Sequence, residues 1–89
     1  MLQRPPYAGA TFVDLVVVPP GDSIGLHTHD RDNEEIYVIV EGRGTMQVDG
    51  ETFGVGAGDV VVNRPGRTHG LDNTGSAPLR LVVVEVAVG

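Results

Sequence analysis

Residues 44–55 read Gly-Thr-Met-Gln-Val-Asp-Gly-Glu-Thr-Phe-Gly-Val, two short runs joined by Asp49-Gly50. Asp-Gly between such runs is a strong signal for a two-residue hairpin, because both residues tolerate the positive φ angles that this turn requires. We therefore expect antiparallel strands over 44–48 and 51–55. Glycines at 56 and 58 then mark a turn into the valine-rich run 60–63, which is typical of a further strand.

The same alternation of short runs and turns continues to both ends of the chain. No segment repeats apolar residues with a helical period over any length, so we expect little or no helix. Many short strands with turns at about 8–12-residue intervals are typical of a β-sandwich or barrel. The predicted fold class is all-β, a small jelly-roll-like barrel of about eight to ten short strands. The remaining strands are expected over 11–18, 23–29, 35–40, 69–73 and 79–88.

The chain has 89 residues, which is enough for one domain. We expect a single domain over 1–89, with a core at about 11–88 and an N-terminal arm at 1–10. A domain this short buries only about 60–65% of its unfolded surface, so a bound metal or a subunit interface would add stability that it needs. Valine-rich runs at 16–18, 60–62 and 82–84 suggest strands covered on both faces, so we expect a homodimer.

Composition excludes several functions. Twelve acidic residues stand against six arginines, with no lysine and a net charge of −6. A chain without a basic patch is not expected to bind nucleic acid or an anionic membrane, and one without lysine or cysteine has no Schiff-base or thiolate chemistry. No apolar run approaches the roughly 20 residues that span a bilayer, and the N-terminus lacks a signal-peptide core. We therefore expect a cytoplasmic protein.

The chain contains only three histidines. His27 and His29 lie two residues apart on an expected strand, so their side chains share one face. His69 begins a later strand, directly after a Pro-Gly turn. Three imidazoles together with a carboxylate are the parts of a transition-metal site.

Two neighbouring glutamates could supply the carboxylate. Glu35 shares its strand face with Tyr37 and Ile39, whereas Glu34 faces the opposite way. Glu35 stands at the start of the expected strand, where it can meet histidines across an antiparallel pair. Parity alone leaves both residues open.

The spacing of these residues resembles the two motifs of the cupin family of small jelly-roll barrels. In the first motif a glycine, here Gly21, is separated from a His-x-His pair by five intervening residues, and six intervening residues separate a glutamate from a second glycine, here Gly42. Counting back from Gly42 gives Glu35, whereas counting forward from His29 favours Glu34. We favour Glu35, because strand register fixes which side chains face one another while a loop absorbs one extra residue at little cost.

The second cupin motif begins at Gly58 and contains His69. Arg64 stands where the motif usually has its first proline, and the neighbouring Pro65 keeps this turn stiff. The resemblance extends over about 16–86. The matching positions are Gly58, Gly66, His69 and Asn73.

The resemblance implies one divalent transition metal per chain (Fe, Mn, Ni, Cu or Zn), with His27, His29, Glu35 and His69 as its ligands. Four ligands in an octahedral sphere would leave two positions open for a small-molecule ligand. The implied function is a small metalloenzyme acting on a small organic molecule, a metal-dependent oxidoreductase of the dioxygenase type or one using other metal-centred chemistry. The alternative is a non-catalytic small-molecule or sugar-binding module, or an accessory protein.

Other residues have expected roles around this site. Tyr37, on the same face as Glu35, is a candidate catalytic residue, although an inward tyrosine on a barrel strand more often has a packing role. Either Met46 or Gln47 points into the barrel, and Asn73 is expected to fix a turn. Glu85 shares its parity with Leu81 and Val83, which leaves an inward acid open, but we expect it to be an outward or interface charge.

Overall fold

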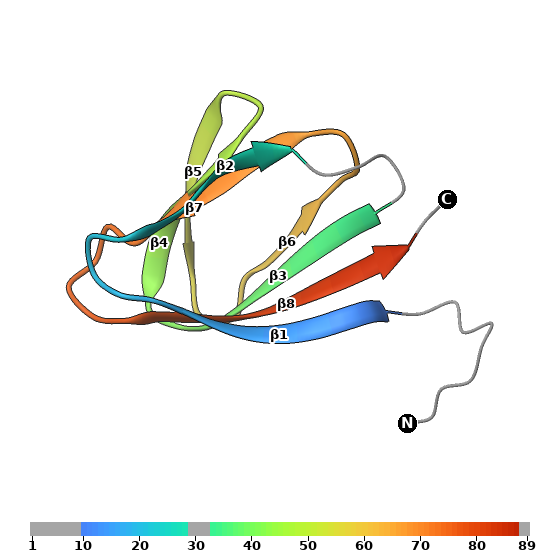
Figure 1. Cartoon of the computed structure of the whole chain (residues 1–89). Coiled ribbons are helices and arrows are strands. Elements are labelled where there is room, and N and C mark those ends of the chain that lie inside the picture. Colours follow the sequence, from blue (N-terminus) through green and yellow to red (C-terminus); the bar gives the residue numbers. More distant parts are fainter. Residues whose placement is uncertain (1–9, 29–32, 88–89) are drawn as a thin grey trace.

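The computed structural model describes residues 10–28 and 33–87 of the chain, and these form an all-β structure (Figure 1). Within these ranges no helix is long and apolar enough to cross a membrane. The fold class predicted from the sequence is confirmed. The eight strands are β1 (Ala10–Val18), β2 (Ser23–Thr28), β3 (Asn33–Glu41), β4 (Arg43–Val48), β5 (Glu51–Gly56), β6 (Val60–Asn63), β7 (Thr68–Asp72) and β8 (Leu79–Ala87).

The strands form two four-stranded antiparallel sheets that face each other (Figure 1). One sheet has the order β1-β8-β3-β6 and the other has the order β2-β7-β4-β5. Apart from the β4–β5 hairpin, each connection along the chain carries it from one sheet to the other. This alternation is the jelly-roll arrangement, and it places side chains from distant parts of the sequence opposite one another between the sheets.

The β4–β5 hairpin forms where Asp49-Gly50 predicts it. Val48 pairs with Glu51, so only two residues lie in the loop. Asp49 has a φ of 48° and Gly50 a φ of 86°, the two positive angles of a type I′ turn.

The core fills the space between the sheets. Tyr37 and Ile39 of β3 and Leu81 of β8 are 1% exposed, and Met46 of β4 and Leu71 of β7 are fully buried. Each such side chain stabilises the fold by about 1.5–3 kcal/mol through burial. Of the two residues that the sequence left open on β4, Met46 is therefore the inward one.

Gly42 closes one end of the sandwich. Its φ is +90°, and a Cβ at this position would lie 2.6 Å from the carbonyl oxygen of Pro78. Only glycine fits this contact between the start of β4 and the segment that leads into β8. The glycine of the first motif is thus required by the backbone.

The outer face of the β1-β8-β3-β6 sheet is apolar. Leu15 of β1 is 77% exposed, Val13 is 61% exposed and Val60 of β6 is 59% exposed. Strand register aligns these residues with others into two rows that cross all four strands. The rows are Val13–Val84–Ile36–Val62 and Leu15–Val82–Val38–Val60.

Candidate metal centre

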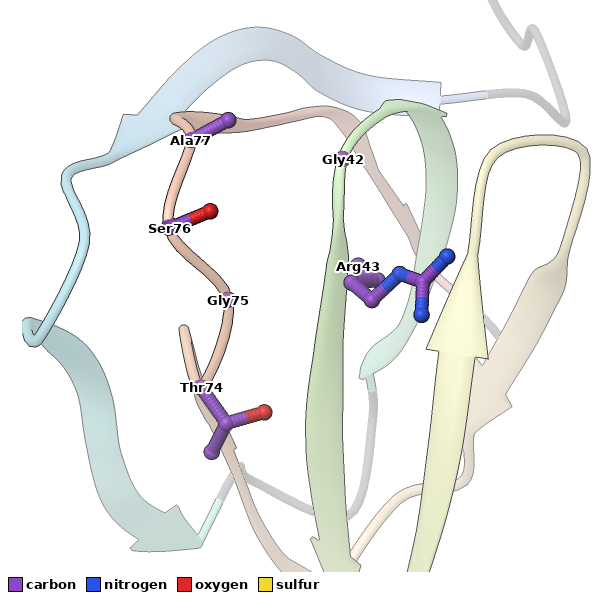
Figure 2. Close-up of a pocket in the computed structure, with 6 residues that line it drawn as sticks. All are labelled: Gly42, Arg43, Thr74, Gly75, Ser76 and Ala77. Carbon is purple, nitrogen blue, oxygen red and sulfur yellow. The ribbon is translucent and has the colours of Figure 1, made fainter.

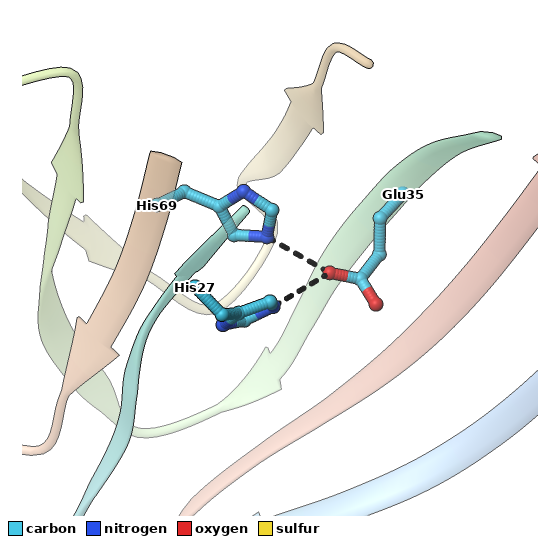
Figure 3. A group of neighbouring side chains, drawn as sticks. All are labelled: His27, Glu35 and His69. Carbon is cyan, nitrogen blue, oxygen red and sulfur yellow. Dashed lines mark hydrogen bonds and ion pairs between the residues drawn. The ribbon is translucent and has the colours of Figure 1, made fainter. Parts of the chain in front are cut away.

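Three side chains from three strands converge between the two sheets. His27 of β2 and His69 of β7 come from one sheet, and Glu35 of β3 comes from the other (Figure 3). The Nε2 atom of His69 lies 2.9 Å from Glu35 Oε1, and the Nε2 atom of His27 lies 3.7 Å from the same oxygen. One ligand atom from each residue lies within 4.8 Å of the other two.

Strand pairing brings the two histidines together. His27 and His69 are register partners in the β2–β7 pair, and their ring centroids are 4.4 Å apart with an interplanar angle of 61°. The register shifts between Ile24 and His27. This one-residue bulge re-aims β2, so that His27 faces the same interior as His69.

Backbone hydrogen bonding orients His27. Its Nδ1–H donates to the carbonyl oxygen of Gly25 at 2.8 Å. In a neutral ring this tautomer leaves the Nε2 lone pair directed at Glu35, which is how metal-binding histidines are commonly held.

The other two residues of the group, Glu35 and His69, are buried and both contact Tyr37. His69 is 0% exposed and Glu35 is 7% exposed. Burial raises the pKa of the Tyr37 hydroxyl, and the charge of Glu35 and a hydrogen bond to it raise this pKa further. Tyr37 therefore stays protonated and donates to Glu35, while its ring packs edge-on against His69 at 5.7 Å.

The group fits a transition metal. A metal that binds nitrogen and oxygen donors at about 2.0–2.2 Å separates them by roughly 3–4 Å, close to the separations that join Glu35 to the two histidines. Imidazole nitrogens and a carboxylate suit Fe, Ni, Cu and Zn, and also Mn. Three candidate ligands are thus brought together in the described part of the chain, drawn from both sheets.

A family model described as the cupin domain matches residues 14–85. The chain belongs to the cupin family. It is 39% identical over 67 residues to an oxalate-binding protein of Thermotoga maritima, covering 75% of this chain and 54% of that protein. It is 36% identical over 83 residues to polyketide synthase CurC of Streptomyces cyaneus, covering 91% of this chain and 53% of that protein.

Solved structures agree with this assignment. A crystal structure of a predicted oxalate decarboxylase from Thermotoga maritima matches with a TM-score of 0.85 and 34% identity, over 90% of this chain and 69% of that one. This cupin spans about half the length of the curated relatives that it matches. Their names describe those longer proteins.

The structure brings together most of the residues that the sequence singled out. His27, Glu35 and His69 form one group, whereas Glu34 lies on the other face of β3, in the row of Val86. Glu35 is therefore the glutamate that faces the histidines. His29 lies outside the described residues.

Two further residues of this cupin lie on the inner face beside Glu35, and the sequence did not predict them as parts of the site. Glu85 of β8 and Asn63 of β6 are the register partners of Glu35 on either side, so all three side chains share the inner face. Glu85, expected to point outward, is half-buried on this face because its strand alternates with the buried Leu81 and Val83. The β3–β6 and β3–β8 pairings place these two residues beside Glu35, and neither motif predicts these pairings.

A hollow lies beyond the end of β7 that is opposite to His69. It has a volume of about 630 Å³ and is lined mainly by backbone and small side chains (Figure 2). Arg43 is the one ionisable residue of its lining. The lining shares no residue with the metal group, by which we mean His27, Glu35 and His69. The lining residues are Gly42, Arg43, Thr74, Gly75, Ser76 and Ala77.

Proposed function

We propose that this cupin holds one divalent transition metal through His27, Glu35 and His69, with His29 as the fourth ligand, and that the metal binds a small organic acid. The observation that carries the proposal is the convergence of two imidazoles and a buried carboxylate from opposite sheets. The likeness to a protein named for oxalate binding supports a ligand that chelates through two carboxylate oxygens.

The residues of the chain prepare the site in defined ways. The Gly25 carbonyl fixes the tautomer of His27, and the Tyr37 hydroxyl fixes the carboxylate of Glu35. When bound, the metal supplies Lewis-acid polarisation and, for a redox-active ion, electron transfer. Acid–base work by Tyr37 is disfavoured by its raised pKa, so a positioning role is better supported for it than proton transfer.

If the protein is an enzyme, it converts the organic acid that is bound to the metal. A site with few free acid–base groups suits metal-centred chemistry, such as that of a dioxygenase or a decarboxylase, better than acid–base isomerisation. A non-catalytic binding protein would share the metal and the ligand but release the acid unchanged.

The test begins with metal-free protein loaded separately with Fe(II), Mn(II), Ni(II), Cu(II) or Zn(II). Oxalate binding is measured by calorimetry, and oxygen uptake and carbon dioxide release are followed under air. We expect oxalate to bind only the metal-loaded protein, and His69→Ala to abolish both metal and oxalate binding. Equal oxalate binding by the metal-free protein would contradict the proposal, and binding without turnover would assign a carrier or sensor.

We also propose that the cupin is a homodimer formed through the apolar outer face of the β1-β8-β3-β6 sheet. Three nine-residue strands about 30 Å long and the four-residue β6, about 13 Å long, lie about 4.8 Å apart and cover roughly 500 Å² before side-chain relief is counted. Side-chain relief adds to this area, which is compared with the roughly 800 Å² per partner of standard protein interfaces. The two central rows of this face contain no charged residue, while the Arg80–Glu41 ion pair and Glu34 lie beyond them.

A further inference from the structure

Asn63 is a buried amide without a structural task. It ends β6, is 2% exposed, and neither its Nδ2 nor its Oδ1 atom has a hydrogen-bond partner. A buried polar group left in this state costs stability, because it has lost its water and gained nothing in return. An apolar residue at this position would serve the fold better.

Asn73 shows what a structural asparagine looks like in the same molecule. It is 3% exposed, and its amide makes three hydrogen bonds to the backbone. Its Nδ2 donates to the carbonyl oxygens of Val18 and Ala77, at 2.8 and 2.9 Å, and its Oδ1 accepts from the Gly75 N–H at 2.9 Å. The turn role predicted for Asn73 is confirmed, and Asn63 has no such role.

The position of Asn63 points to the metal group. Asn63 is the register partner of Glu35, and residues paired in this way have Cβ atoms about 4.5–5.5 Å apart on one face. The outward positions of β6 are taken by Val60 and Val62, so the amide is turned to the interior.

The interior around Asn63 carries negative charge, so an anionic ligand bound there depends on a hydrogen-bond donor. Glu35 and Glu85 bring two carboxylates to the row in which Asn63 stands, and the Tyr37 hydroxyl is engaged by Glu35. An organic acid on the metal would therefore need a neutral N–H donor to hold its outer oxygen. Among Glu35, Tyr37, Glu85 and Asn63, the amide of Asn63 is the donor that remains.

We infer that Asn63 is a specificity-determining residue of this site, whose Nδ2–H donates to a carboxylate oxygen of the metal-bound acid. The inference rests on the proposed function and names the chemistry that the site selects. A ligand with a carboxylate oxygen turned toward β6 gives the Nδ2–H of Asn63 an acceptor, and a ligand that presents an apolar group there leaves this donor unsatisfied. Asn63 is thus retained for the ligand at a cost to the free protein.

The test compares wild-type protein with Asn63→Leu, and uses Asn73→Leu as the matched buried asparagine. Each protein is loaded with Mn(II) under nitrogen, so that oxidation does not consume the ligand, and is titrated with oxalate. We expect Asn63→Leu to bind Mn(II) within about threefold of wild type and to bind oxalate about 10- to 100-fold more weakly, the range for a hydrogen bond to a charged group. The metal-free Asn63→Leu protein should melt at or above the wild-type temperature, whereas Asn73→Leu should melt lower.

Three outcomes would overturn the inference. Unchanged oxalate affinity in Asn63→Leu, with wild type binding both metal and oxalate, would refute the role of Asn63 and leave the proposed function intact. A parallel loss of Mn(II) affinity would show that Asn63 positions Glu35 instead of the ligand, and a lowered melting temperature would show a structural role. A wild-type protein that binds no metal would overturn the proposed function first. Asn63→Ala, which removes the amide without adding bulk, repeats the measurement if leucine disturbs the fold.

Discussion

The hydroxyl of Tyr37 holds the buried carboxylate of Glu35 from outside the group of His27, Glu35 and His69. Hydrogen-bond partners of metal ligands fix the orientation of those ligands, and their loss commonly weakens metal binding by about 10- to 100-fold. We therefore predict that Tyr37→Phe lowers metal affinity by this factor while the fold is retained, because phenylalanine keeps the ring contact with His69. Competition with a chromophoric chelator measures the affinity. An unchanged dissociation constant would reduce Tyr37 to a packing residue.

Glycine at position 42 is a second single-residue requirement, and Gly50 provides a matched control. Both have a positive φ, but a Cβ at Gly42 would lie 2.6 Å from the Pro78 carbonyl oxygen, whereas nothing lies within 4 Å of one at Gly50. We predict that Gly50→Ala costs about 1–2 kcal/mol, the price of a left-handed conformation. Gly42→Ala should cost at least about 2 kcal/mol more, since backbone must move. Urea denaturation of the two variants measures the difference, and equal costs would contradict the close contact.

At the scale of the element, alternation along β3 divides its residues between two tasks. Glu35, Tyr37 and Ile39 face the interior, whereas Ile36 and Val38 face outward with Glu34. We predict that Glu35→Gln lowers metal affinity at least about 100-fold and that Glu34→Gln leaves it within about threefold. The same chelator competition compares the two variants, each of which replaces one carboxylate with an amide of equal size. Loss of metal binding in Glu34→Gln would mean that the register of β3 is shifted by one residue.

Strand positions were predictable here because short local sequence signals determine the turns between strands. Asp49-Gly50, Gly56 and Gly58 fix where β4, β5 and β6 begin and end, and the observed bounds lie within two residues of the expected ones. The inward faces were harder to predict. His27 and Ile24 are three residues apart and both pair with inward residues, which strict alternation does not allow, and a bulge on β2 resolves the difference.

The candidate site also contains residues that the sequence predicted and residues that only the structure revealed. The two histidines and Glu35 were found from the sequence because each lies in a motif with characteristic spacing. Asn63 and Glu85 acquire their significance only through pairing with Glu35, which links β3 to β6 and to β8. Local sequence does not encode which strands become neighbours in a jelly roll, so no pattern in the chain marked these two residues as parts of one row.

At the scale of the whole molecule, a small core makes stability dependent on what the protein binds. The metal group joins the two sheets through His27, His69 and Glu35, so a bound ion would cross-link them. A ligand that binds only the folded state at 100 times its dissociation constant stabilises by about 2.7 kcal/mol. We predict that one equivalent of tightly bound metal raises the melting temperature by several degrees and that a chelator reverses the rise. His69→Ala should show neither effect, and an equal rise in that variant would place the stabilising metal elsewhere.

Self-association would cover the apolar outer face of the β1-β8-β3-β6 sheet and would also add to stability. Leu15 is 77% exposed on the outer face of β1, and Leu26 is 66% exposed on β2 of the other sheet, so the two leucines form a matched pair. A charge buried at the centre of an apolar interface is unpaired and costs several kcal/mol, whereas the same charge on a free surface costs little. We predict that wild-type protein sediments as a dimer at micromolar concentration, that Leu15→Lys sediments as a monomer, and that Leu26→Lys remains dimeric. A monomeric wild-type protein would refute the dimer, and a monomeric Leu26→Lys with an intact dimer in Leu15→Lys would move the interface to the β2-β7-β4-β5 sheet.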